Sequence, residues 1–186
     1  MPAGIECADA IIKGAPVDSI RTGTTHPGKY VVLVTGDTAS VDVARDIVAD
    51  LKRPSLIDVV FLPDIAADVA DVLLSTERPL DVDAEAVGVV ETATVASGID
   101  AADAAVKHAN VALSGLRLAD GLGGKAYFLV DGTVGEVAAA VDAAHDRSGN
   151  AVTDSVVIPQ LTPELREDLE AAATFADSVA AYGAQS

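Results

Sequence analysis

The apolar residues of this chain alternate between two spacings, and the alternation occurs twice. Around Ile5, and again around Ile99, apolar residues recur at three and four positions, as they do on one face of an α-helix. Each of these stretches is followed by two short apolar runs with a glycine-rich loop between them, which predicts a β-hairpin. In both halves a second helical pattern follows, and then a last apolar run that ends at a proline and leads into a terminal helix.

This pattern predicts the order of strands and helices. In chain order, strands are expected at 17–21, 30–34, 57–62, 86–92, 111–116, 127–130 and 153–158. The strand at 86–92 has no counterpart in the first half. The second half therefore reads β-α-β-β-α-β-α, the order of an α+β domain in which helices cover one face of a sheet.

The two halves also match residue by residue. Residues 4–13 return at 98–107 with an offset of 94, and the Gly28-Lys29 pair returns at Gly124-Lys125 with an offset of 96. A period of about 95 residues is far longer than that of solenoid repeats, so we predict two fused copies of one small domain. The first domain is expected at 1–76, a linker with Pro79 and four acidic residues at 77–85, and the second domain at 86–186.

The opening strand is the one element that the first copy lacks. By the offset of 94, Met1 corresponds to Val95, which lies beyond the end of the strand at 86–92. We expect either that the natural reading frame begins upstream or that the first sheet has lost a strand. In a split β-α-β sheet this strand is central, so its loss is expected to leave backbone groups unpaired.

Composition and charge narrow the classes of function. Half of the residues are apolar but only 3% are aromatic, which predicts a core of Ala and Val with closely packed elements rather than a roomy ligand pocket. The net charge of -17 argues against nucleic acid and anionic membranes as partners. No apolar run approaches the roughly 18 residues that would span a bilayer. The single Cys7 cannot form an internal disulfide, which is typical of a protein of the reducing cytosol.

The sequence lacks the catalytic motifs that would favour an enzyme. The chain has no H-E-x-x-H, no C-x-x-C and no serine in a nucleophile turn. Gly23, Gly28 and Lys29 fit the start of a phosphate-binding loop, but Tyr30 follows in place of Ser or Thr, and a strand is expected there instead of a helix. We interpret these glycines as a turn in which the backbone takes positive φ.

The second half carries a resemblance to a known family. Its motifs are AVGVVET at 86–92, AADAAVKHANV at 101–111, GTVGEV at 132–137 and VVIP at 156–159. They resemble the bacterial microcompartment shell domain, and the first half is similar to a diverged copy of it. The chain thus resembles the tandem-domain, trimeric shell proteins of the propanediol-utilisation type. This resemblance implies an α+β fold of two fused ferredoxin-like domains, the first without its opening strand.

The resemblance also implies a function and partners. We expect a homotrimer with a pseudo-hexagonal outline that tiles with other shell proteins around a microcompartment in the bacterial cytoplasm. It would pass small metabolites through a central pore and would not be an enzyme. The alternative is a trimeric sensor of ferredoxin-like fold that binds a metabolite in a cleft between chains. A sensor predicts saturable binding and discrete trimers, whereas a shell tile predicts sheets or tubes.

The two glycine-rich hairpin loops are the parts that the resemblance places around the pore. The residues expected to line it are Gly23, Thr24, Thr25, His26, Pro27, Ala119, Asp120, Gly121, Leu122 and Gly123. Three copies of Asp120 would form a ring of carboxylates that favours cations or neutral polar molecules over anions. The alternative is an ordinary solvated loop aspartate.

His26 raises the question of a metal. In the resembled proteins a cysteine at this loop position supplies ligands to an iron-sulfur cluster by threefold symmetry. Because histidine stands here instead, we expect no iron-sulfur cluster and no other cofactor. Three symmetry-related copies of His26 would suit a zinc-like ion. The alternative is a histidine that faces water in the pore and changes its charge near neutral pH.

A second set of residues is expected at the edges of the tile. The family places a lysine at the end of the first helix, where Lys13 and Lys107 stand, and the alternative is a solvated lysine favoured by the helix dipole. The other expected edge residues are His108, Asn110 and Gln160. The family often has Arg at the position of Gln160, so this change predicts weaker self-tiling relative to mixed tiling.

Overall fold

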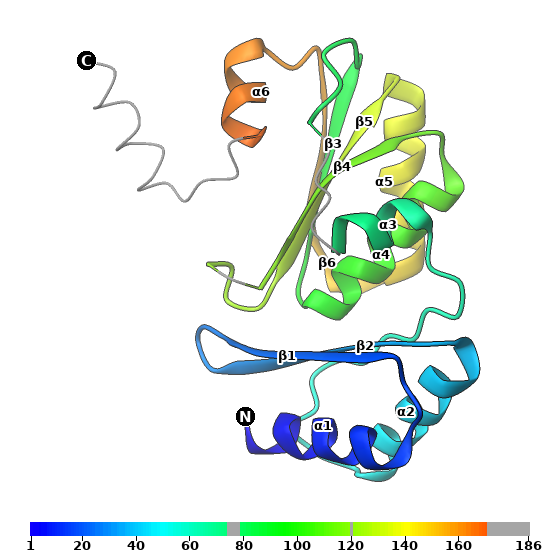
Figure 1. Ribbon diagram of the computed structural model, residues 1–186. Coiled ribbons are helices and arrows are strands. Elements are labelled where there is room, and N and C mark those ends of the chain that lie inside the picture. The colour runs from blue at the N-terminus through cyan, green and yellow to red at the C-terminus, as the bar shows by residue number, and fades with distance from the viewer. Residues whose placement is uncertain (74–78, 120, 171–186) are drawn as a thin grey trace.

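The computed structural model describes residues 1–73, 79–119 and 121–170, and it contains two α+β units in succession (Figure 1). The first unit comprises helix α1 (Pro2–Gly14), strands β1 (Ser19–Thr25) and β2 (Lys29–Thr35), and helix α2 (Thr38–Asp50). Helix α3 (Ala67–Leu73) lies between the two units in the chain. The second unit comprises β3 (Ala86–Thr92), α4 (Val95–His108), β4 (Ala112–Leu118), β5 (Ala126–Gly132), α5 (Val134–Ser148), the 3₁₀ turn η1 (Gly149–Ala151), β6 (Val152–Pro159) and α6 (Pro163–Glu170).

Side-chain caps fix where three of the helices begin. The Thr94 hydroxyl accepts a hydrogen bond from the Ser97 N–H at 3.0 Å at the start of α4. Thr133 caps α5 in the same way, and its counterpart in the first copy, Asp37, caps α2. Hydrogen bonds from Ser40 hold the pKa of the Asp37 carboxyl below its ordinary value. Each cap satisfies an N–H group that the first helical turn leaves without an internal partner.

The second unit has a four-stranded sheet in the order β4-β5-β3-β6, with all neighbours antiparallel. Phe128 and Val130 of β5 are fully buried in the core beneath α4 and α5. The helices lie close to this sheet because small residues face it. A Cβ atom on Gly98 of α4 would lie 2.5 Å from the Ala126 Cβ. The predicted core of Ala and Val is therefore confirmed for this unit.

The strand predicted at 57–62 is wrong. These residues, all of which the structure describes, form no strand, and Ile57 and Val59 are 66% and 45% exposed. Their counterpart in the second copy is β6, which pairs with β3. The described part of the first unit has no strand equivalent to β3, and its sheet is the β1-β2 hairpin. An apolar run cannot satisfy its backbone as a strand without a neighbour to pair with.

Two smaller predictions also need correction. The first strand was expected at 17–21 but runs from Ser19 to Thr25, because β1 pairs with β2 up to the Thr25–Lys29 pair. Helices were expected on one face of the sheet, but α6 lies against the other face of the second sheet (Figure 1). There Leu161 and Leu80 pack against Val87 and Leu129.

The two units pack against each other. Val31 of β2 and the fully buried Val69 of α3 join the core of the second unit. The opposite face of the β1-β2 hairpin carries Val32 and Val34, which pack with Ile11 and Ala44 in the core of the first unit. In the described part of the chain, no helix is long and apolar enough to cross a membrane.

Candidate functional site at the hairpin tips

The turn between β1 and β2 is short and exposed. The Gly28 N–H donates to the Thr25 carbonyl at 2.9 Å, and the His26–Pro27 peptide is cis. Gly28 has a φ of 112°, a conformation that a residue with a side chain rarely adopts. The His26 side chain is exposed at this tip. The strand β2 begins at Lys29, so no helix N-terminus is present here to bind a phosphate.

The turn between β4 and β5 is longer, since it spans residues 119–125 whereas the first turn spans residues 26–28. The Ala119 N–H donates to the Lys125 carbonyl at 2.9 Å, and the Leu122 N–H donates back to the Ala119 carbonyl at 3.1 Å. Ala119, Gly121 and Gly123 all have positive φ. Asp120, the proposed source of a carboxylate ring, lies outside the described residues.

The two tips lie against each other. The Thr25 hydroxyl donates to the Ala119 carbonyl at 2.9 Å, and Thr25 is only 4% exposed. A Cβ atom on Gly124 would lie 2.5 Å from the Lys29 Cδ, and one on Gly123 would lie 3.9 Å from Pro27. The structure thus brings together residues that the sequence analysis assigned to one site from two loops 94 residues apart.

The described residues do not assemble a metal site within one chain. No group of three or more His, Cys, Asp or Glu side chains in the described ranges is arranged to hold an ion. Cys7 does not fit the ligand set of an iron-sulfur cluster, because it is a buried residue of α1 and not part of a hairpin tip. Burial raises the pKa of the Cys7 thiol, and the neighbouring Glu6 carboxylate raises it further.

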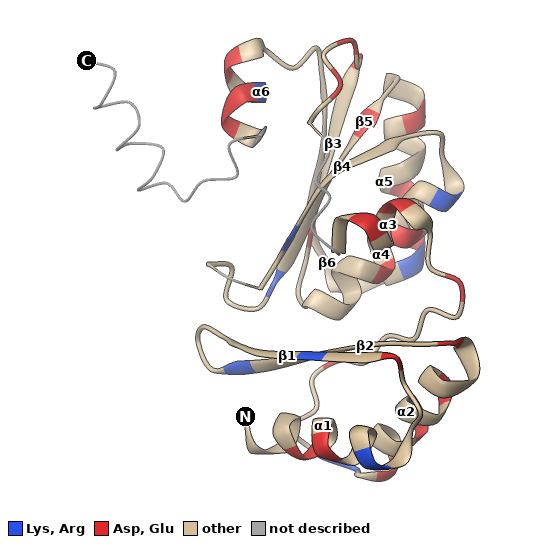
Figure 2. Cartoon of the chain, viewed as in Figure 1, with Lys and Arg blue, Asp and Glu red and all other residues tan. Residues whose placement is uncertain are grey.

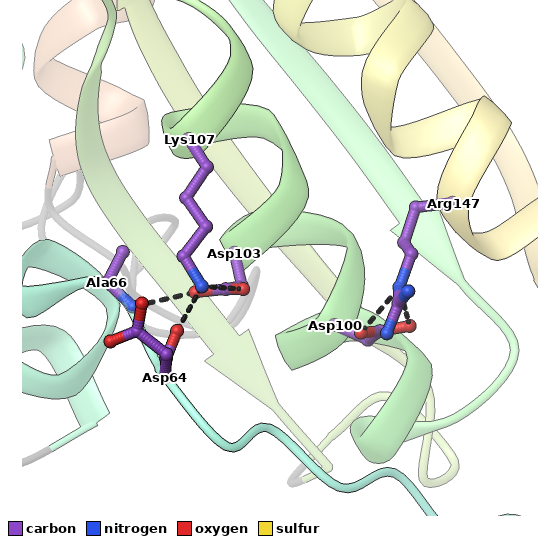
Figure 3. Close-up of polar contacts among 6 residues, drawn as sticks. All are labelled: Asp64, Ala66, Asp100, Asp103, Lys107 and Arg147. Carbon is purple, nitrogen blue, oxygen red and sulfur yellow. Dashed lines mark hydrogen bonds and ion pairs between the residues drawn. The ribbon is translucent and has the colours of Figure 1, made fainter.

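The end of α4 contacts the first half of the chain (Figure 3). The Lys107 ammonium donates to the Asp64 carbonyl and to the Asp103 carboxylate, the second contact being 2.7 Å. The same carboxylate accepts the Ala66 N–H at 2.7 Å. The predicted edge residue Lys107 therefore has backbone and carboxylate partners within its own chain, although it stays 41% exposed.

The other predicted edge residues lie at exposed positions. Lys13 is 73% exposed and pairs with Asp9 at 2.7 Å. His108 and Asn110 are exposed at the end of α4, and the Asn110 N–H donates to the Glu136 carboxylate at 2.7 Å. Gln160 follows β6 with a φ of 56°, and its N–H donates to the Glu85 carbonyl at 2.8 Å.

The sequence analysis did not identify two carboxylates of α4 that bind neighbouring segments. Asp103 is buried, and Asp100 accepts two hydrogen bonds from the Arg147 guanidinium, both at 2.9 Å (Figure 3). In the first copy an ion pair between Glu6 and Arg53 joins α1 to the loop that follows α2. The signal was available, since an acidic residue stands at both positions in each copy of the repeat.

A shallow cavity lies on the face of the second sheet that α6 partly covers. Its volume is about 330 Å³, and it is lined by Val89, Glu91, Tyr127, Asp154, Ser155 and Val156. Lys125 and Thr153 each donate to the Glu91 carboxylate at 2.7 Å, and these hydrogen bonds hold the pKa of that carboxyl below its ordinary value. Acidic residues are spread over the helices and loops of both units (Figure 2), so the described surface has the negative character expected from the composition.

Comparison with known proteins identifies the family. The model of the BMC domain matches residues 1–65 and, separately, residues 86–161. The chain belongs to the BMC-domain family. It is 39% identical over 146 residues to the bacterial microcompartment shell protein PduT of Citrobacter freundii, a match that covers 78% of each chain.

A solved structure supports the same assignment. A microcompartment protein from Desulfitobacterium hafniense DCB superposes with a TM-score of 0.75 at 34% sequence identity, over 90% of this chain and 93% of the other. The tandem arrangement of two BMC domains in one chain is thereby confirmed. The α+β fold class inferred from the sequence is confirmed with it.

Proposed function

We propose that this tandem BMC-domain protein is a structural shell protein of a bacterial microcompartment in the bacterial cytoplasm. Three copies form a pseudo-hexagonal ring, the paired hairpin tips surround a central pore, and small metabolites pass through it. The protein binds its own copies and other shell proteins, and it has no catalytic role.

The contact between Thr25 and Ala119 is the observation that carries the proposal. These residues are counterparts in the two copies, and they meet through a 2.9 Å hydrogen bond. When equivalent residues of two domain copies lie side by side, the rotation axis that relates the two copies passes near those residues. Continuing that arrangement through three chains places six hairpin tips around one opening.

Family membership supports the role in a shell. The relative from Citrobacter freundii is described as a microcompartment shell protein, and this chain matches 78% of its length. We place a contact with neighbouring tiles at the end of α4, where Lys107, His108 and Asn110 are exposed. A lysine there has three donors on a flexible stem and can reach backbone carbonyls of a neighbour.

Assembly of the purified protein tests this proposal. Sedimentation analysis over a range of concentrations is expected to give the mass of three chains, and electron microscopy of the concentrated protein is expected to show sheets or tubes. A chain that stays monomeric at high concentration would overturn the proposal. Discrete trimers that bind one metabolite stoichiometrically and never form sheets would favour the sensor instead.

A further inference from the structure

One face of α4 is covered by a segment from the first half of the chain. The Asp103 carboxylate accepts the Ala66 N–H at 2.7 Å, and Lys107 donates to Asp103 and to the Asp64 carbonyl (Figure 3). Val69 of α3 is fully buried beside these contacts in the core of the second unit. Residues 64–73 thus dock on α4 through backbone groups and apolar side chains.

The counterpart face on α1 has the same chemistry but is uncovered. Asp9 and Lys13 correspond to Asp103 and Lys107, and their ion pair has the same length of 2.7 Å. The side chains of Asp9 and Lys13 are 59% and 73% exposed, whereas that of Asp103 is 8% exposed. The apolar residues of this face repeat the contrast, because Ile5 is 55% exposed and its counterpart Ile99 is 8% exposed.

The segment of the second copy that corresponds to residues 64–73 also has exposed residues. Residues 160–169 correspond to 64–73 by the offset of 96. Gln160 and Thr162, the counterparts of Asp64 and Ala66, are both exposed. Leu165 is 42% exposed, whereas its counterpart Val69 is fully buried. This segment turns other residues inward, since Leu161, just before α6, packs on the sheet and Arg166 of α6 donates to the Asp81 carbonyl.

The two uncovered surfaces cannot meet within one chain. Helices α1 and α6 lie at opposite ends of the molecule (Figure 1). A second copy of the chain supplies both surfaces, and it supplies them with the pairing chemistry that residues 64–73 and α4 already use. A contact of this kind is head-to-tail and closes into a ring when the rotation between copies allows.

We propose that residues 160–169 of one chain dock on α1 of a second copy. The Thr162 N–H donates to the Asp9 carboxylate of the other chain, and Lys13 of the other chain donates to the Gln160 carbonyl. Leu165 covers the exposed apolar residues of α1, among them Ile12, which is 61% exposed. The inference rests on the proposed ring and names its contact between chains. It gives Lys13 and Gln160 a contact within the ring, as Lys107 has with Asp64.

Cysteine crosslinking tests the contact directly. In a Cys7→Ser background, one protein carries Ile12→Cys and a second carries Leu165→Cys. Mild oxidation of an equal mixture is expected to give a disulfide-linked dimer that contains one chain of each kind, while each protein alone gives much less. A single chain with both substitutions is expected to give a ladder of linked chains, because α1 and α6 of the same chain are too far apart to join.

A charge-removal variant gives a second readout. Lys13→Ala is expected to weaken association of the chains by about 10- to 100-fold in sedimentation analysis, because it removes a charged donor to a backbone carbonyl. Lys52→Ala, which removes an exposed lysine between α2 and α3, is the matched control and is expected to leave association unchanged.

The outcomes separate this inference from the proposed function. Trimers that form normally, resist the Lys13→Ala change and give no linked dimer would overturn the docking of 160–169 on α1 and leave the shell proposal standing. A parent protein that stays monomeric at every concentration would overturn both.

Discussion

The Thr25 hydroxyl donates a hydrogen bond to the Ala119 carbonyl at 2.9 Å, and the two residues are counterparts in the two copies of the domain. The bond joins the end of β1 to the residue that follows β4. The two copies differ here, since the second copy has Ala where the first has a hydroxyl donor. In a ring of chains, Ala119 of one chain would stand where Thr25 stands in this contact. Because alanine has no hydroxyl, it cannot donate the same bond to the Thr25 carbonyl of the next chain.

Removing this hydroxyl is expected to loosen the paired tips. Thr25→Val keeps the shape of the side chain but removes the hydrogen bond that links the two tips, while the Ala119 carbonyl keeps the Leu122 N–H as a donor. The free energy of unfolding is therefore expected to fall by about 1 kcal/mol. Urea unfolding of dilute protein measures the change. Thr24→Val, at the exposed neighbouring position, is the control and is expected to have no effect. Equal values for the two variants would mean that the hydroxyl contributes nothing.

The two lysine–aspartate pairs are expected to differ in energy despite their equal length. Asp103→Ala removes the acceptor of a backbone N–H and the partner of Lys107 at a buried position, and it is expected to cost about 2 to 3 kcal/mol. Asp9→Ala breaks an exposed pair and is expected to cost under about 0.5 kcal/mol in dilute monomer. Denaturant unfolding below the concentration of assembly measures both. Similar losses of stability in the two variants would show that docking of residues 64–73 does not strengthen the Asp103–Lys107 pair.

Two counterpart glycines give a matched test of helix packing. A Cβ on Gly98 would lie 2.5 Å from the Ala126 Cβ and 2.9 Å from the Thr92 Oγ1, and these atoms are held by a buried sheet. A Cβ on Gly4 would lie 2.5 Å from the Tyr30 Cδ1, and Tyr30 is a half-buried residue of the two-stranded hairpin rather than of a buried sheet. Gly98→Ala is expected to destabilise by about 1 to 2 kcal/mol after its gain in helix propensity. Gly4→Ala is expected to stay within about 1 kcal/mol of the parent. Thermal unfolding checks both, and the reverse order would contradict the packing described.

Glu91 gives a pH dependence with a defined sign. Its pKa in the folded protein is lowered by hydrogen bonds from Lys125 and Thr153, so its ionised form contributes stability above the unfolded pKa of about 4.3. That contribution is lost as the pH falls through the folded pKa. Glu91→Gln is therefore expected to destabilise at pH 7, and the difference from the parent is expected to shrink as the pH falls from about 4.3 to more acidic values.

Urea unfolding between these pH values measures the difference. Glu167→Gln, at an exposed position of α6, is the control for loss of one charge. A difference between Glu91→Gln and the parent that stays constant with pH would assign the effect to packing rather than to ionisation.

The exposed ring of His26 is expected to face water and not to bind a resident metal. A zinc site of three histidines needs partners that orient each ring. Elemental analysis of the purified protein is expected to find fewer than about one zinc ion per three chains. One zinc ion per three chains that disappears in His26→Ala would contradict this and establish a threefold metal site.

Several parts of the fold could be predicted because they depend on local pattern. The strand at 86–92 was predicted with the observed bounds, and the cap residues Asp37 and Thr133 stand where the helical pattern begins. The two glycine-rich turns were predicted because positive φ at Gly28 and Gly124 favours glycine wherever it occurs. These signals are carried by residues close together in the chain.

The failures share one physical cause, which is that a partner distant in the chain decided the outcome. The apolar run at 57–62 has the composition of a strand, but a strand needs hydrogen-bonding neighbours and the described first unit offers none at that position. Lys107 shows the same dependence, because its contact with the Asp64 carbonyl joins residues 43 positions apart, which local spacing does not indicate.

By itself the sequence determined the duplication, the α+β order of elements and the residues of both hairpin tips, because these follow from spacing along the chain. Tertiary structure decided that Thr25 meets Ala119, that Asp103 is buried while Asp9 is exposed, and that residues 64–73 pack on the second unit. The reason is physical. Similar local sequences in the two copies experience different surroundings, and burial against a distant segment changes what the matching side chains do.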